Sequence, residues 1–229
     1  MRKISKNEHL NFFVIIPAYN EARNIRKCIN QIRPYCHQII VVNDGSTDKT
    51  GEIIDTIRGI KTIHLEKNWG KGYAMRMGAE LAWKLGAEGV IFMDGDNQHH
   101  PKHIKEFARE LKRGNEIVIG IRLLKAEIPW HRKAGNVLMA TLMRKLFMIA
   151  IPDIMCGFRA FTKQGYERVS WLSNNYGVET EVITIIGRRK LPFKTVVVDT
   201  IYLDKYKGFS IWDGFRIIAQ LPNYWWRNL

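Results

Sequence analysis

Residues 91–98 read Ile91-Phe92-Met93-Asp94-Gly95-Asp96-Asn97-Gln98. The apolar run favours a buried strand, which delivers two carboxylates, one residue apart, into the loop that follows. Carboxylates are rarely buried without a partner. Asp94 and Asp96, with the amide oxygen of Gln98, are able to converge on a hard cation such as Mg²⁺ or Mn²⁺ and leave coordination positions for a diphosphate. The alternative is a solvated Asp-Gly-Asp turn, because turns use the same residues.

Similar apolar runs recur from residue 12 to about 121 and alternate with helical periods. Buried strands are expected at residues 12–16, 38–42, 62–65, 90–93 and 117–121. Helices are expected from Asn20 to about 32, from Thr47 or Asp48 to 57, from 72 to 85, and from Pro101 onward. This alternation predicts an α/β fold with a mostly parallel central sheet, helices on both faces, and binding groups at the carboxyl ends of the strands.

The pattern changes after residue 122 to a basic, loop-like stretch. A long amphipathic helix is expected near 136–150, and strands near 157–162 and 196–203. There is no Pro/Gly/Ser-rich linker and no internal repeat, so residues 1–229 are predicted to form a single domain in which the second half covers the crevice of the first.

The composition restricts the partners and the compartment. An excess of 36 Lys and Arg over 22 Asp and Glu gives a formal net charge of +14, which favours a phosphorylated substrate, an anionic membrane surface or nucleic acid. Three cysteines without CxxC spacing predict neither a disulfide framework nor a zinc site, and a reducing cytosol fits best. The basic start and the short apolar run ending at Pro17 do not suit a secretory signal. The apolar stretch 146–151 is far below the ~20 residues that cross a bilayer, so any membrane contact is expected to be peripheral.

Residues 14–21, VIIPAYNE, run from a strand through a sharp turn into a helix start. This segment is expected to place its backbone, the Tyr19 ring and the Glu21 carboxylate beside the base or ribose of a nucleotide. The alternative is an ordinary turn between a strand and a helix, which uses the same residues. Its candidate residues are Pro17, Ala18, Tyr19 and Glu21.

Two more segments carry candidates. In residues 41–48, VVNDGSTD, Asp44 lies at the strand tip and could accept a hydrogen bond from a base, whereas Thr47 or Asp48 is expected to cap the next helix. Residues 68–73, NWGKGY, lack the spacing of a Walker phosphate loop, which excludes that class of NTPase. Lys71 and Gly72 nevertheless offer a charge and an approachable backbone at a positive helix end, which suits phosphates; a plain turn is the alternative.

Together, in this order and spacing, these segments resemble the nucleotide-sugar-dependent family 2 glycosyltransferases of the GT-A fold. The resemblance covers residues 12 to about 120 and rests on P-A-Y-N-E, N-D-G-S-T-D, G-K-G and D-G-D. It implies that Asp44 reads the base, that Asp94 lies near the sugar or ribose, and that Asp96 with Gln98 holds the divalent cation on the diphosphate.

Two longer strings narrow the resemblance. Residues 94–101 follow a D-x-D-x-Q-H-x-P pattern that is similar to the polyprenyl-phosphate sugar transferases of the dolichol-phosphate mannose synthase type. Residues 153–161 are similar to that group's D-x-x-S-G-F-R-x-F segment, with Cys156 in place of Ser. The resemblance implies that three arginines hold the acceptor's phosphate, because guanidinium forks match phosphate oxygens. They are Arg122, Arg132 and Arg159.

The C-terminal region matches less closely. Lys205, Lys207 and Ser210 fall where the group has a basic loop that closes over the donor diphosphate, but Lys205 replaces an Arg and Ile211 replaces a Lys. Glu181 aligns with an acid that would orient the arginines or the sugar, although acids also favour a helix N-terminus. The tail ends in Tyr-Trp-Trp-Arg at 224–227, which suits either core packing or an interfacial anchor on anionic lipid.

The residues and the resemblance predict an enzyme that transfers a hexose, with inversion, from a GDP-mannose or UDP-glucose type donor to a polyprenyl or dolichyl phosphate. Residues 12–121 would bind the nucleotide sugar and residues 122–229 the acceptor, with Mg²⁺ or Mn²⁺ as cofactor, at the cytoplasmic face of a membrane. The acceptor phosphate is already anionic, so no general base is needed.

Two alternatives stay open. One keeps the donor chemistry with a soluble or other hydroxyl acceptor, for which Asp153 or Glu181 would be the base. The other is a non-catalytic protein that binds anionic ligands. Nucleic acid is not expected, because the aromatic residues do not interleave with Lys and Arg, and the strand-end carboxylates repel phosphates. The sequence carries no signal for an oligomeric state.

Overall fold

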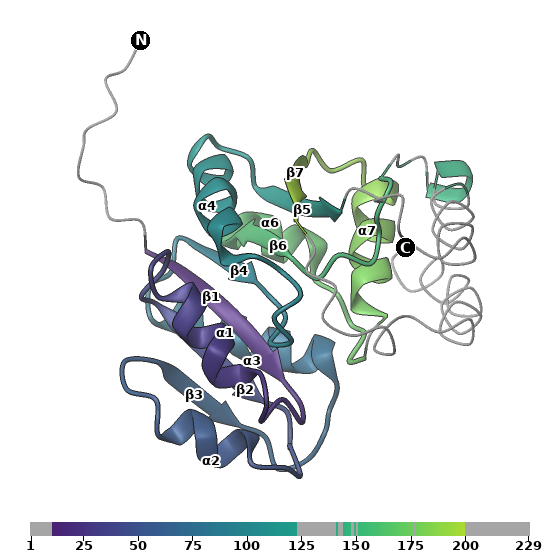
Figure 1. Cartoon of the computed structure of the whole chain (residues 1–229). Helices are drawn as coiled ribbons and strands as arrows, with labels where there is room; N and C mark the ends of the chain where they lie inside the picture. Colours follow the sequence, from purple (N-terminus) through teal and green to yellow (C-terminus); the bar gives the residue numbers. More distant parts are fainter. Residues whose placement is uncertain are drawn as a thin grey trace, which may run out of the picture.

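A computed structural model describes residues 11–122, 141, 144–147, 149, 151–175 and 177–199 (Figure 1). Within these residues, seven strands form one sheet in the order β3-β2-β1-β4-β6-β5-β7. The strands are β1 (Phe12–Ala18), β2 (Ile39–Asn43), β3 (Lys61–His64), β4 (Gly89–Phe92), β5 (Ile117–Arg122), β6 (Arg159–Thr162) and β7 (Lys194–Val198). The helical segments are α1 (Ile25–Ile32), α2 (Thr50–Asp55), α3 (Lys71–Lys84), η1 (Pro101–His103), α4 (Ile104–Lys112), α6 (Lys163–Val169) and α7 (Val178–Arg188).

The sheet is mostly parallel, as the alternating pattern predicts. The neighbouring pairs β1 with β2, β1 with β4, β2 with β3 and β5 with β7 are parallel. Only β6 runs the other way, and it lies antiparallel between β4 and β5. The start of β6 therefore lies beside the end of β4, which matters for the site.

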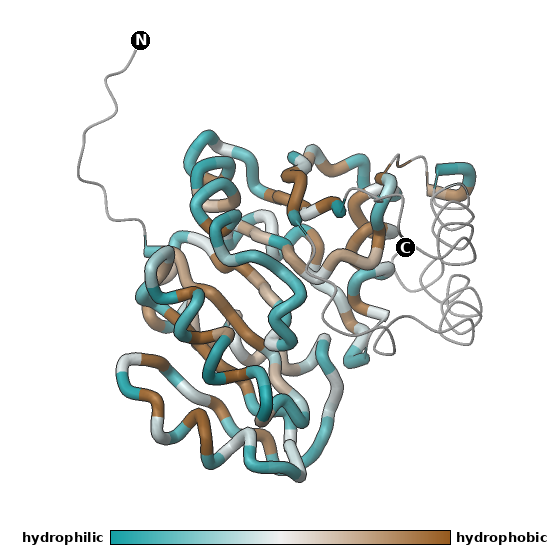
Figure 2. The backbone as a smooth tube through the Cα atoms, in the orientation of Figure 1, coloured by the Kyte–Doolittle hydropathy of each residue, from teal (hydrophilic) through white to brown (hydrophobic). Residues whose placement is uncertain are grey.

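The core has two layers, one on each face of the sheet. Along β1, Phe13 and Ile15 pack with apolar residues of α3 and α7, whereas Val14 and Ile16 pack with those of α1, α2 and α4. Figure 2 shows the hydrophobic strands between more hydrophilic outer surfaces. Each fully buried isoleucine contributes roughly 1.5–3 kcal/mol, so a strand that is apolar on both faces is held firmly between the helices. The predicted fold class is confirmed.

The expected elements and the observed ones differ mainly at helix starts. Asn20 does not cap α1, which begins at Ile25; its Oδ1 instead accepts a hydrogen bond from the Thr47 backbone N–H at 2.9 Å. That prediction is wrong because Asn20 bonds to a distant loop rather than to its own helix. Asp48 precedes α2, and its Oδ1 accepts the Thr50 N–H at 2.9 Å. The helix expected from Pro101 begins as the 3-10 turn η1 and continues as α4.

In the second half, β6 confirms the strand expected near 157–162, and β7 covers the beginning of the one expected at 196–203. Residues 144–147 are helical, and most of the long helix expected at 136–150 lies outside the described residues. None of the helices in the described part of the chain combines the length and the apolar character that a membrane span needs.

Candidate active site

The carboxyl ends of β1, β2 and β4 meet at one edge of the sheet, because these strands run parallel side by side. Tyr19 follows β1, Asp44 follows β2, and Asp94 lies two residues after β4. The segment that leads into β6, residues 153–158, reaches the same edge because β6 is antiparallel to β4. The structure therefore brings together motifs from both halves of the sequence.

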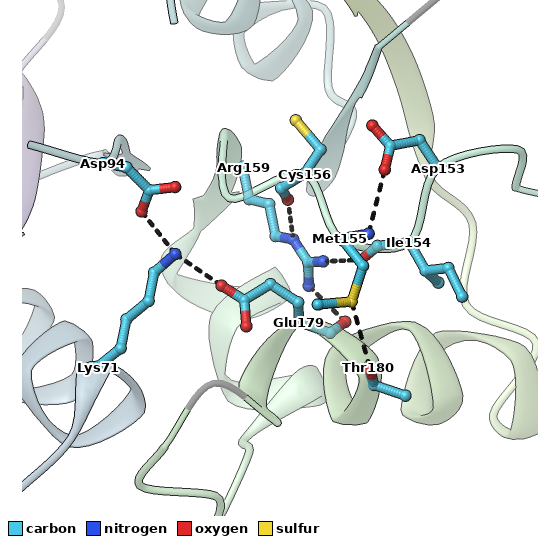
Figure 3. Close-up of polar contacts among 9 residues, drawn as sticks. All are labelled: Lys71, Asp94, Asp153, Ile154, Met155, Cys156, Arg159, Glu179 and Thr180. Atoms are coloured by element: carbon cyan, nitrogen blue, oxygen red, sulfur yellow. Dashed lines mark hydrogen bonds and ion pairs between the residues drawn. The ribbon is translucent and has the colours of Figure 1, made fainter. Parts of the chain in front are cut away.

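Asp94 forms an ion pair with Lys71, the lysine of the Gly-Lys-Gly segment. Lys71 Nζ lies 2.5 Å from Asp94 Oδ1 and 2.6 Å from Glu179 Oε1 (Figure 3). Burial alone would lower the pKa of Lys71, but the two carboxylates outweigh it and raise that pKa, so the ammonium stays charged. Lys71 begins α3, and Glu179 lies in the first turn of α7.

The acidic loop, residues 94–98, carries two carboxylates in unequal environments. Burial alone would raise the pKa of Asp94, but Lys71 outweighs burial and lowers it. Burial, and next the charge of Asp94, raise the pKa of Asp96 to about 6. The two acids repel each other, and a divalent cation held near both of them would relieve this repulsion.

The donor set of the acidic loop fits a hard divalent cation. Asp94, Asp96 and Gln98 supply oxygen atoms, the ligands that Mg²⁺ and Mn²⁺ prefer. Among the described residues, Asp94, Asp96 and Glu179 place three carboxylates near the ammonium of Lys71, so these four groups together are negatively charged. No group of three His, Cys, Asp or Glu side chains among the described residues is arranged to hold a metal ion.

Two buried residues fix the path of the acidic loop. Asn97 has a φ of +62°, which its short polar side chain tolerates, and its Nδ2 donates to Asn24 O at 3.2 Å. His99 packs against the Phe158 ring, with 5.7 Å between ring centroids. Burial lowers the pKa of His99 to about 4, so the imidazole is neutral near pH 7. The loop is thus held from α1 on one side and from the segment before β6 on the other.

Asp44 holds a loop in this structure. Its buried carboxylate accepts the backbone N–H groups of Trp69 and Gly70, both at 2.8 Å. The Trp69 ring is 42% exposed, and Lys67 Nζ lies 4.3 Å from its centroid. Base recognition by Asp44 stays a prediction; the contacts observed show that Asp44 shapes the wall of the candidate nucleotide site.

The glycines beside Lys71 are explained by packing. A Cβ on Gly72 would overlap Ser173 O and lie 3.1 Å from Asn174 O, and the Trp171 Nε1 donates to Gly72 O at 3.1 Å. Gly70 has a φ of +97°, which favours glycine. Residues 173 and 174 thus cover the Cα side of Gly72, and contact of its backbone with phosphates stays a prediction.

The end of β1 presents the predicted nucleotide wall. Pro17 and Ala18 are the last residues of β1, and the exposed Tyr19 follows them. The Glu21 N–H donates to Thr50 Oγ1 at 2.8 Å, which ties the turn to α2. These residues line the same edge as Asp44, and their contact with a nucleotide stays a prediction.

Arg122 ends β5 and is gripped by a carboxylate. Its Nε and Nη2 lie 2.6 and 2.9 Å from the two oxygens of Asp153, and its backbone N–H donates to the same group at 3.0 Å. Burial alone would raise the pKa of Asp153, but Arg122 outweighs it and lowers that pKa. Asp153 thus fixes the direction of the guanidinium at the edge of the sheet.

Arg159 has a different environment from the one that the sequence favours. Its side chain is 1% exposed, and Nε, Nη1 and Nη2 donate to the backbone carbonyls of Cys156, Glu179 and Ile154 at 3.0, 2.9 and 2.8 Å (Figure 3). A phosphate could reach this guanidinium only after these bonds are rearranged. The observed contacts make Arg159 the residue that fastens the 154–156 segment to α7.

Other candidates are placed as follows. The Glu181 carboxylate accepts the N–H groups of Leu172 and Ser173 at 3.0 and 2.7 Å and thereby holds the segment that covers Gly72. The remaining predicted site residues, Arg132, Lys205 and Ser210, lie outside the described residues, together with the C-terminal tail.

Sequence reasoning missed two residues at the centre of the site. It assigned no role to Glu179, yet this side chain is 4% exposed and pairs with Lys71. It quoted Gly157 only as part of a motif, yet a Cβ there would overlap Asp94 Oδ2 and lie 2.9 Å from Lys71 Nζ. The signal for Glu179 was its place in the first turn of an otherwise apolar helix, where an acid is buried only with a partner.

Comparisons with known proteins show the family of the chain. A family model described as Glycosyl transferase family 2 matches residues 13–170. The chain is 28% identical over 235 residues to a UDP-N-acetylglucosamine–dolichyl-phosphate N-acetylglucosaminyltransferase of Methanococcus voltae, covering 91% of this chain and 94% of the relative. It is 29% identical over 167 residues to a polyprenol monophosphomannose synthase of Mycolicibacterium smegmatis, covering 68% and 63%.

Among solved structures, a glucosyl-3-phosphoglycerate synthase of Mycobacterium tuberculosis, in complex with Mn²⁺, UDP-glucose and phosphoglyceric acid, superposes with a TM-score of 0.69. The sequence identity is 21%, and the match covers 94% of this chain and 80% of that one. This likeness concerns the fold.

Proposed function

The chain belongs to glycosyl transferase family 2, and on that premise we propose that it transfers a hexose from a nucleoside diphosphate sugar to a polyprenyl phosphate. It is a glycosyltransferase with an α/β fold whose relatives include enzymes named for dolichyl phosphate and polyprenol. The observation that carries the proposal is the meeting of the acidic loop, Lys71 and the Arg122–Asp153 pair at one edge of the sheet.

The donor would lie along the ends of β1 and β2. We propose that Pro17, Ala18, Tyr19, Glu21 and Asp44 form the nucleotide wall and that Lys71 faces the diphosphate. Asp94, Asp96 and Gln98 would hold Mg²⁺ or Mn²⁺. When bound, this ion would neutralise the negative charge that develops on the departing diphosphate. The mycobacterial structure that holds Mn²⁺ and UDP-glucose in a similar fold supports this arrangement.

The acceptor would approach from the second half. An oxygen of its phosphate attacks the anomeric carbon, the bond from that carbon to the diphosphate oxygen breaks, and the nucleoside diphosphate leaves with the bonding electrons. Arg122, which is fixed by Asp153, would orient the acceptor phosphate. In a reaction that needs no general base, this positioning of the reactants accounts for most of the rate acceleration. The further phosphate contacts predicted for Arg132 and Arg159, and closure by Lys205 and Ser210, remain part of the proposal.

The contacts of two acids favour this acceptor over a neutral hydroxyl group. A hydroxyl acceptor needs a general base, and the sequence offered Asp153 and Glu181. Asp153 is committed to Arg122, and Glu181 accepts two backbone N–H groups. Because both carboxylates already serve as hydrogen-bond acceptors, a nucleophile that arrives as an anion fits the site better.

We also propose that residues 1–229 act as one domain, peripheral to the cytoplasmic face of a membrane. The insertion of β6, from the second half, between β4 and β5 supports the single domain. Cosedimentation with vesicles that contain anionic lipid tests the membrane part; protein that stays in the supernatant at low salt would remove it.

The donor and acceptor are tested together. The protein is incubated with Mn²⁺ or Mg²⁺ and a panel of nucleotide sugars, with and without a short polyprenyl phosphate, and release of nucleoside diphosphate is measured. We expect release from one donor, at least tenfold faster with the lipid. Equal rates for a hydroxyl acceptor would contradict the lipid assignment.

The acidic loop is tested by Asp96→Asn, with Asp55→Asn as a matched control. Asp55 is an exposed acid of α2 that pairs with His64 on the surface. We expect Asp96→Asn to lose at least 100-fold in kcat, the size seen when an electrostatic stabiliser is removed, and Asp55→Asn to keep full activity. Full activity of Asp96→Asn would disprove the cation site.

A further inference from the structure

We propose that Glu179 is a positioning residue that keeps the Lys71 ammonium in the site when a divalent cation replaces it on the Asp94 carboxylate. The inference rests on the proposed function, because it concerns the cation and diphosphate site. In this proposal the Lys71 ammonium neutralises Asp94 as long as no divalent cation is bound. Once a cation binds Asp94, the Lys71 ammonium pairs with Glu179 alone.

The bridging position of Lys71 is the first step. Its Nζ lies between Asp94 Oδ1 and Glu179 Oε1, at 2.5 and 2.6 Å (Figure 3). The ammonium therefore pairs with the same carboxylate that a cation in the acidic loop would use. An ammonium and a divalent cation on one carboxylate repel each other strongly in a buried site, so the two compete for Asp94.

The second carboxylate is the next step. Glu179 is 4% exposed, and its Oε2 has no hydrogen-bond partner among the described residues. An ammonium has three N–H donors. If Lys71 leaves Asp94, the free Oε2 lets it bond to both oxygens of Glu179, which replaces the lost contact without exposing the charge.

Glu179 is also held in place, as a fixed counter-ion must be. Its backbone carbonyl accepts a hydrogen bond from Arg159 Nη1 at 2.9 Å, and the same guanidinium binds the carbonyls of Cys156 and Ile154. Arg159 thus locks the first turn of α7 to the segment before β6. The backbone that carries Glu179 is therefore fixed, and in this proposal it is the ammonium that moves between the two carboxylates.

Charge balance points the same way. Asp94, Asp96 and Glu179 carry three negative charges against one on Lys71. A divalent cation and the Lys71 ammonium together would balance these three carboxylates. Without Glu179, the ammonium would have to remain on Asp94 against the cation or leave for solvent.

The test measures Mn²⁺ binding without nucleotide, by the electron paramagnetic resonance signal of free Mn²⁺. The variants are Lys71→Met, Glu179→Gln and the double variant, with Lys84→Met as control. Lys84 is an exposed lysine in the last turn of the same helix, α3. The double variant carries a neutral pair in place of the buried salt bridge, and melting temperatures verify that each protein is folded.

We expect Lys71→Met to bind Mn²⁺ at least tenfold more tightly, about 1.4 kcal/mol, because the competing ammonium is gone. Glu179→Gln should bind at least tenfold more weakly, because Lys71 then depends on Asp94 alone. The double variant should match Lys71→Met within threefold, and Lys84→Met should match the unmodified protein.

Three results would overturn the inference. In the first, Lys71→Met binds Mn²⁺ no better than the unmodified protein. In the second, Glu179→Gln weakens binding by the same factor whether or not Lys71 is present, which shows that Glu179 acts only through its own charge. In the third, no variant binds Mn²⁺, which removes the metal part of the proposed function as well. If the four variants show the expected Mn²⁺ affinities but the unmodified protein cleaves no nucleotide sugar, the inference is supported and the proposed function is refuted.

Discussion

Gly157→Ala should disable the acidic loop through a contact that the sequence motif does not reveal. A Cβ at this position would overlap Asp94 Oδ2 and lie 2.9 Å from both Asp94 Cγ and Lys71 Nζ. Ordinary contact begins near 3.4 Å, so the Asp94 carbon has to retreat by about 0.5 Å and its oxygen by more. A displacement of ~1 Å costs roughly 100-fold in rate. We therefore expect kcat/KM for the nucleotide sugar to fall by about 10- to 100-fold, measured as initial release of nucleoside diphosphate.

A matched control separates this effect from overpacking. A Cβ on Gly78, in the middle of α3, would overlap Ile15 Cγ2 in the apolar core instead of a carboxylate. Both variants are expected to lose about 1–3 kcal/mol of stability in urea unfolding. Only Gly157→Ala should lose activity per folded molecule. The reasoning is refuted if Gly157→Ala keeps kcat/KM within threefold of the unmodified protein, or if Gly78→Ala loses as much.

Three further substitutions test the contacts around the site. Asp44→Asn replaces one of the two carboxylate oxygens that accept the Trp69 and Gly70 N–H groups by an NH₂ donor, and so releases this loop. The Kd for nucleoside diphosphate, measured by calorimetry, should rise at least tenfold. An unchanged Kd would show that other contacts hold the loop. Asp153→Asn should cost about 3 kcal/mol at pH 7, because it removes the carboxylate that forms the ion pair with the half-buried Arg122 guanidinium. Folding lowers the pKa of Asp153, so the stability that its carboxylate contributes is complete above pH ~5 and is lost as the pH falls below ~4. The free energies of urea unfolding of Asp153→Asn and of the unmodified protein should therefore converge in acid. A difference that stays constant with pH would contradict this. Arg159→Lys keeps the positive charge but loses the planar guanidinium that reaches three carbonyls, so the free energy of unfolding should fall by about 3 kcal/mol. A melting temperature within about 2 °C of that of the unmodified protein would mean that no such loss occurs and would rule this out.

The strands and most helices could be predicted from the sequence because their signals are local. Every strand expected before residue 122 is observed within two residues at each end, since buried runs are bounded by Pro, Gly, Asn and Asp. The start of α1 was misplaced because Asn20 hydrogen-bonds to Thr47, a choice that no local pattern encodes.

The site divides in the same way. The acidic loop and Asp44 could be proposed as site residues because polar residues directly after apolar strands are conspicuous, and the structure places them at one edge of the sheet. The pairing of Lys71 with Glu179, the overlap of Gly157 with Asp94 and the covering of Gly72 all join segments far apart in the chain, which no local pattern encodes.

The reversed strand also affects how the protein is made. β4 and β5 follow each other in the chain but do not pair, because β6 separates them in the sheet. As the polypeptide emerges from the ribosome, β5 has no neighbour until residues beyond 159 have been synthesised, and its unpaired edge is open to aggregation in the meantime. A fragment truncated at residue 122 would carry this edge permanently, so the first half is expected to be a poor target for separate expression.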